Sequence, residues 1–169
     1  MKQSWIEEFV SNSLYRFDES VRMLEICMGY LDENRFWDRP NPASNSIGNL
    51  LLHLAGNIRQ YVISGLGGAA DTRARDSEFM QGLRKDPQEV WHAFLGTVNE
   101  AREAIKRATE ADLLGKKYVQ GFHLSGMGMV LHAVEHLSYH TGQIAWAIKA
   151  ARDTDLGFYD GTDLNLKNE

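Results

Sequence analysis

Apolar side chains recur every three or four residues along four stretches of the chain, and this helical spacing constrains the fold more than any other feature. The first stretch covers residues 5–31 and follows Ser4, a residue type that caps helix N-termini. The second follows Ser44 or Ser46, either of which can cap it, and ends at the glycines that begin with Gly65. The first half of the chain therefore predicts two long amphipathic helices.

Two further helices are predicted in the second half. One begins at the pair Asp86–Pro87, where the aspartate can cap the helix and proline suits the first helical position. The other runs from about Gly126 to about Arg152, a length of roughly 40 Å at ~1.5 Å per residue. Four amphipathic helices predict an all-α fold, an antiparallel four-helix bundle, in which cofactor sites form between facing helices.

Segments 67–85 and 114–125 show no strand-like alternation, and we expect both to be irregular. The 67–85 loop is long and charged, and connections of that length are usually functional or disordered. The tail, residues 153–169, is mostly polar, and its apolar side chains Leu156, Phe158 and Tyr159 can dock on the bundle. We expect a single domain over residues 1–169.

The composition excludes several classes of protein. There are 18 Lys and Arg against 23 Asp and Glu, so the net charge of −5 offers no general attraction for nucleic acid. Glu7 and Glu8 interrupt what would have to be the apolar core of a signal peptide, and no stretch is long and apolar enough for a membrane helix. The single cysteine excludes an intrachain disulfide framework. We therefore expect a soluble, cytoplasmic protein with no nucleic-acid or membrane partner.

Three histidines are spaced by four residues in the predicted last helix: His132, His136 and His140. On a helical wheel His132 and His140 lie about 40° on either side of His136, in the middle of the apolar face, where an unpartnered polar group is costly to bury. Imidazoles four residues apart can converge on one metal ion at about 2.0–2.1 Å. The pattern favours a metal site over histidines that only pack in the core.

A third ligand should come from another helix. His53 lies at the edge of the apolar stripe of the second helix, close in angle to Asn57, and can point into the bundle. His92 projects away from the apolar face of the third helix, and we expect it at the surface. His123 lies in an irregular segment and can approach the site, although nothing in the sequence fixes it there. His53 is therefore our choice.

A histidine in the second helix, followed by the string HxxxHTGQI over His136–Ile144, resembles the DinB/YfiT superfamily of metal-binding four-helix bundles. The strings SIGNLLLHLAGN and GGAADTRARDSEF are similar to an uncharacterised branch of that superfamily. The resemblance implies a divalent metal (zinc, nickel, iron or manganese) bound by His53, His136 and His140 in an open site. It also implies frequent homodimers, and a small-molecule substrate, since some relatives transfer low-molecular-weight thiols.

Further residues are expected around this site. His132 exceeds the usual triad and is predicted to be a pocket residue, a supporting residue or an additional ligand; Gln143 lies on the same inward stripe, and Asn57 lies beside His53. The charged segment that contains Arg73 and Arg75 can cover the pocket and bind an acidic thiol carrier, or it can be a solvated loop.

Three neutral imidazoles would leave the charge of the ion available to a thiol or to water. The inward stripe offers no carboxylate that could act as a general base, since Glu135 lies at its margin. This favours thiol transfer over a metal-dependent hydrolase. The second alternative is a dimeric binding or structural module with a non-catalytic metal, which a fourth protein ligand would indicate.

Two other motifs are weaker. His132–His136 matches the HxxEH pattern of zinc proteases but leaves His140 unexplained, and the ExxH string at Glu89 occurs only once, whereas a di-iron bundle needs two. Cys27 lies on the apolar side of the first helix and is expected to be a small core residue, not a nucleophile.

Overall fold

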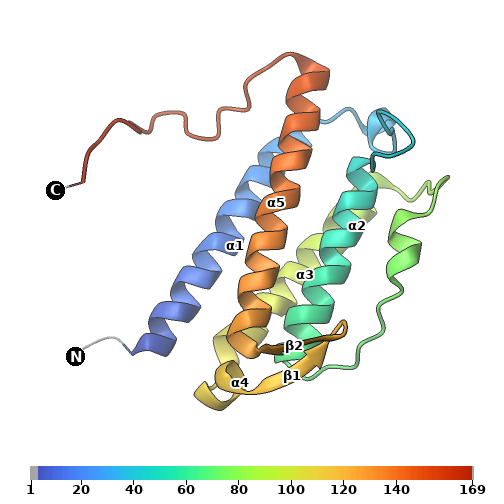
Figure 1. Cartoon of the computed structure of the whole chain (residues 1–169). Helices are drawn as coiled ribbons and strands as arrows, with labels where there is room; N and C mark the ends of the chain where they lie inside the picture. The colour runs from blue at the N-terminus through green and yellow to red at the C-terminus, as the bar shows by residue number, and fades with distance from the viewer. Residues whose placement is uncertain (1–3, 169) are drawn as a thin grey trace.

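Long helices make up most of the computed structural model, which describes residues 4–168 (Figure 1). In chain order the elements are α1 (Trp5–Tyr30), η1 (Glu33–Arg35), α2 (Ile47–Ile58), η2 (Arg59–Leu66), η3 (Arg75–Phe79), α3 (Pro87–Arg107), α4 (Glu110–Leu114), β1 (Lys116–Val119), β2 (Phe122–Ser125) and α5 (Gly126–Arg152). The wide-turned η2 continues α2 without a break. The four long helices coincide with the four stretches of helical periodicity.

The helices begin where the sequence offers side chains that accept from free backbone N–H groups. The Ser4 side chain accepts from the third residue of α1 in a capping box, and the Ser46 side chain does the same for α2. Asp86 caps α3 with Pro87 in its first turn, and Ser125 caps α5. The predicted helix starts are therefore confirmed, and Ser46, not Ser44, is the cap of the second helix.

The helix directions differ from a plain antiparallel arrangement. The start of α3 lies beside the connection between α1 and α2, where Gln88 Nε2 donates to Glu33 Oε1 (2.7 Å) and Trp37 Nε1 donates to the Lys85 carbonyl (2.9 Å). Consequently α2 and α3 both run away from that end (Figure 1). The reason is segment 67–85, which returns the chain along the whole length of α2 before α3 begins. We call this segment the crossover.

The expectation of an irregular segment at 114–125 is wrong. Strands β1 and β2 pair antiparallel, with Lys116 opposite Ser125 and Val119 opposite Phe122. The turn between them places Gln120 and Gly121 at positive φ (51° and 83°), as tight hairpins require. Most of the strand side chains are exposed, and both strands have only four residues. β1 shows no apolar alternation, and the alternation of Phe122 and Leu124 in β2 is too short to predict a strand by itself.

The core lies between the four long helices and is almost entirely aliphatic and aromatic. Fully buried side chains come from each of them, including Phe17, Leu54, Phe94 and Leu137. In the tail, Leu156 is buried against this core and Phe158 packs beside it, as expected, whereas Tyr159 is exposed. Among the described residues, no helix has the length and hydropathy that a membrane span needs.

The single cysteine provides a test of this packing. Cys27 is fully buried on α1, and burial raises the pKa of its thiol to about 11. The thiolate is the reactive form, so at pH 8 the folded protein holds far less of it than a free cysteine with a pKa of ~8.5. We expect Ellman's reagent to leave Cys27 unmodified at pH 8 and to react with one thiol per chain in 6 M guanidinium. Rapid reaction of the native protein would contradict the core position of Cys27.

Candidate metal centre

Three imidazole rings meet between α2 and α5. His53 on α2 is buried, and His136 and His140, one turn apart on α5, are half-buried. The Nε2 atom of His136 lies 3.1 Å from Nε2 of His53 and 3.3 Å from Nε2 of His140. One ring nitrogen from each of the three lies within 4.8 Å of the other two. The structure thus brings together the three histidines that the sequence singled out.

Hydrogen-bond acceptors outside the cluster determine which ring nitrogen carries the proton in His53 and His140. The Glu78 carboxylate lies 2.8 Å from His53 Nδ1, and the Gln143 amide oxygen lies 2.7 Å from His140 Nδ1. Both oxygens are acceptors, so each Nδ1 is the N–H that donates. In a neutral imidazole the other nitrogen then has no proton. His140 therefore directs an Nε2 lone pair towards His136, and His53 does the same in its neutral form.

His136 and His140 are neutral at physiological pH. Burial lowers the pKa of His136 to about 3, with further lowering from His140 and His53. Burial also lowers the pKa of His140, against an opposing hydrogen bond to Gln143. A neutral His136 has one proton, which Nε2 can donate to only one of its two neighbours. When His53 is neutral as well, at least one lone pair in the cluster faces another nitrogen without a proton between them.

A cation satisfies this arrangement. Imidazole nitrogens bind zinc and similar ions at about 2.0–2.1 Å, so two of them at bond angles of about 90–110° are about 2.9–3.4 Å apart. The two short Nε2 separations, 3.1 and 3.3 Å, lie within that interval. Neutral imidazole is the form that ligates metals. The donor set and these two separations are therefore compatible with a divalent ion.

A buried ion pair from the crossover supports His53, and sequence reasoning missed it. Arg73 donates to both oxygens of Glu78, through Nε (2.7 Å) and Nη2 (2.9 Å), and the two side chains are only 3% and 9% exposed. Burial raises the pKa of Glu78, but hydrogen bonds from Arg73 and His53 outweigh this effect, so its pKa lies below the usual value. Glu78 is therefore an ionised carboxylate, and it accepts the hydrogen bond from His53 Nδ1. Carboxylates in this position are common behind metal-bound histidines.

The close approach of this pair depends on a glycine of α2. A Cβ atom at Gly56 would overlap the Glu78 carboxylate and lie 3.0 Å from Arg73 Nε. Any other residue there would push the crossover away from His53. The crossover is thus packed on the helix, whereas Arg75 remains exposed beside the Phe79 ring.

The remaining predicted residues have mixed outcomes. His132 does not join the three-histidine cluster: its Nε2 is 3.2 Å from Asn57 Nδ2, and its ring stacks on Tyr61 at 4.0 Å. Asn57 is buried, and its Oδ1 atom has no partner within the described residues. Gln143 is exposed, not inward, although it still holds His140.

Two histidines lie outside the centre. His92 is exposed on α3, as expected, and His123 is exposed on the hairpin, where it stacks on Tyr118. Glu135 is exposed as well. A protease-type HxxEH site is therefore not formed, because it requires His132 and His136 as joint ligands with Glu135 as the base.

Comparison with known proteins places this geometry in a family. A model of proteins of unknown function, DUF1572, matches residues 4–158. The chain belongs to this family. A crystal structure of a DinB-like protein from Bacillus subtilis, YjoA, resembles it with a TM-score of 0.65 at 17% identity, over 90% of this chain and 97% of that one. The chain therefore shares the fold of a DinB-like protein, as the sequence resemblance implies. No curated protein matches the DUF1572 chain in sequence.

The buried ion pair leads to a prediction about stability. Glu78→Gln removes the charge that neutralises Arg73, whose side chain is 3% exposed, and leaves a buried cation without its partner. Breaking a buried pair from one side costs about 3–5 kcal/mol, so we expect a loss of that order in the free energy of unfolding, measured with urea. In the control, Glu100→Gln breaks the exposed pair with Arg59 and should cost less than about 1 kcal/mol. Equal, small losses in both variants would contradict the packing of the crossover.

Proposed function

We propose that this chain binds one divalent metal ion through the Nε2 atoms of His53, His136 and His140 and acts as a metal-dependent enzyme. The observation that carries the proposal is the approach of three imidazole nitrogens at the spacing of metal ligands. Zinc, nickel, iron and manganese all accept such donors, and the choice among them depends on more than the three rings.

The number of protein donors favours catalysis over a structural role. Structural zinc sites have four protein ligands, whereas catalytic sites have three and leave a position for an exogenous molecule. Within residues 4–168 the cluster contains three donors, since His132 is engaged with Asn57 and His123 is exposed elsewhere. This count supports an open site.

The surrounding residues favour thiol transfer over hydrolysis. When bound, a divalent ion held by three neutral imidazoles would lower the pKa of a thiol ligand and supply a thiolate at neutral pH. Hydrolysis generally needs a free carboxylate as base. Glu78 already accepts from Arg73 and His53 on both oxygens, and Glu135 is exposed. We therefore propose a low-molecular-weight thiol as one substrate.

Metal content tests the first step. Protein purified without an affinity tag should contain about one divalent ion per chain by elemental analysis, and His136→Ala should lose it because two of three donors are too few. The matched control is His92→Ala, which removes an exposed histidine of α3 and should retain the ion. Full retention in His136→Ala, or equal loss in both variants, would overturn the assignment.

The thiol is tested with cobalt, whose visible spectrum reports its ligands. Adding 2-mercaptoethanol to the cobalt-loaded protein should produce a sulfur-to-cobalt charge-transfer band in the near ultraviolet, because the open position accepts soft ligands. Ethylene glycol, the oxygen analogue, should leave that region unchanged. A cobalt-loaded protein that shows no such band at any thiol concentration would remove the thiol from the proposal and leave the metal site intact.

A further inference from the structure

A groove runs along α2 and α5 beside the histidine cluster. Residues between 40 and 47 form one wall with Leu50, and Tyr139, Gly142, Gln143 and Trp146 of α5 form the other. Its volume is about 480 Å³, within the range of about 300–1,000 Å³ that small-molecule sites occupy. We call it the α2–α5 groove. It is large enough for a molecule with two aromatic rings.

The lining of the groove selects against charge. None of the side chains that line it is ionised, and most of them are apolar. The rings of Tyr139 and Trp146 are 62% and 69% exposed, although such rings usually contribute large buried areas. Gly142 leaves space between them, since a Cβ atom there would meet nothing within 4 Å. These walls suit an uncharged, flat ring that stacks on the two aromatic residues.

Two lining residues connect the groove to the candidate metal centre. Gln143 accepts from His140 Nδ1 at 2.7 Å, and the Tyr139 ring lies edge-on to the His140 ring with centroids 5.0 Å apart. A molecule in the groove therefore lies one side chain away from a ring that faces the cluster. Leu50 is one turn before His53 on α2, so both helices present the groove and the cluster side by side.

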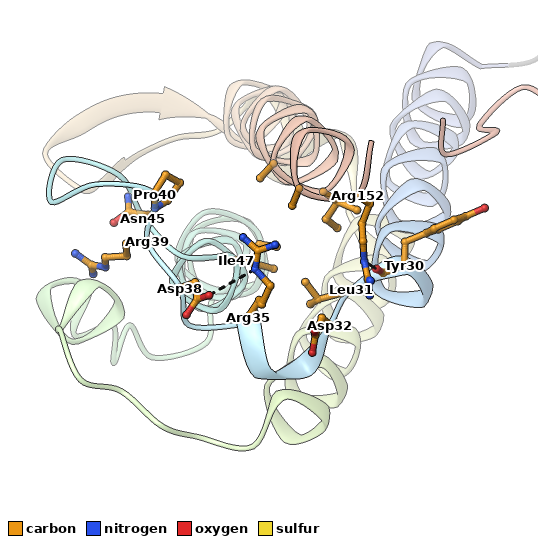
Figure 2. A pocket seen from close by; sticks show the side chains of 13 residues that line it. Tyr30, Leu31, Asp32, Arg35, Asp38, Arg39, Pro40, Asn45, Ile47 and Arg152 are labelled. Atoms are coloured by element: carbon orange, nitrogen blue, oxygen red, sulfur yellow. Dashed lines mark hydrogen bonds and ion pairs between the residues drawn. The ribbon is translucent and has the colours of Figure 1, made fainter. Parts of the chain in front are cut away.

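Charged side chains gather in the adjoining hollow instead. That hollow of about 280 Å³ shares Pro40, Asn45 and Ile47 with the groove but is also lined by Arg35, which pairs with Asp38 at 3.6 Å (Figure 2). The charged and uncharged walls are thus separated along one continuous depression, with the uncharged part next to His140.

We propose that the α2–α5 groove binds the uncharged, ring-bearing part of the substrate and thereby determines specificity. This inference rests on the proposed function, in which the reacting group of that substrate is presented at the cluster. Tyr139 and Trp146 are the specificity-determining residues, and Gln143 both lines the groove and positions His140.

The groove is tested first without a metal, using the full chain treated with EDTA and the uncharged fluorescent probe N-phenyl-1-naphthylamine. The probe should bind with increased fluorescence, and Gly142→Leu should weaken binding by about tenfold or more, because a leucine there occupies the groove. Trp146→Ala should weaken it as well. The control is Gly29→Leu on α1, which also introduces a leucine into open space and should change affinity less than about twofold.

The absence of probe binding, or equal affinity in Gly142→Leu and Gly29→Leu with both variants folded by circular dichroism, would overturn the groove. If a second copy of the chain covers the groove instead, the wild type excludes the probe and Gly142→Leu lowers the molar mass in solution. Each of these results contradicts the inference without affecting metal content, so its failure is distinguishable from that of the proposed function.

The connection between groove and centre is tested with cobalt-loaded protein. 4-Phenylimidazole should both change the cobalt spectrum and displace the naphthylamine probe, because its imidazole reaches the ion while its phenyl ring enters the groove. Imidazole alone should change the spectrum and leave the probe bound. A spectral change by 4-phenylimidazole without probe displacement would show that the groove and the centre are separate, and would overturn the assignment of Tyr139 and Trp146 to specificity.

Discussion

The structure depends on keeping three imidazoles in a largely apolar interior, with burial disfavouring the charged forms of His136 and His140. A protonated histidine at this depth would lose its hydration, and burial accordingly depresses the pKa of His136 to about 3. Glu78 and Gln143 accept the Nδ1 protons of the two neighbouring rings from outside, whereas Nδ1 of His136 is buried without a partner among the described residues. All three Nε2 atoms are therefore left to face one another. Lone pairs that face one another repel in the rings alone, and a bound cation would replace this repulsion with attraction.

The crossover connects the topology of the fold to this centre. A short connection after η2 would have sent the third helix back beside α2 in the opposite direction. The long segment instead passes over the outside of α2, and η3 places Glu78 behind His53 with Arg73 beside it. Gly56 provides the space for this contact. The crossover thus determines both the direction of α3 and the orientation of His53.

The parts of the molecule that could be predicted are those governed by helical geometry. His136 and His140 lie on one helix, so their separation follows from the pitch alone, and the position of His53 followed from its angle to the apolar stripe. Glu78 could not be found in this way, because it lies in a segment without periodicity, 25 residues from its partner. The only sequence features that pointed to Glu78 were the length and the charge of that segment. The hairpin was missed because Gln120–Gly121 is not among the usual turn pairs.

The contact between the crossover and His53 has a thermodynamic consequence. Arg73 and Glu78 favour one orientation of the His53 ring, and the same orientation is the one that a bound ion would require. Coupling free energies are reciprocal, so a ligand at the ring and order in the crossover strengthen each other by the same factor. A ligand at the ring would therefore also stabilise the docked crossover, through the single carboxylate of Glu78.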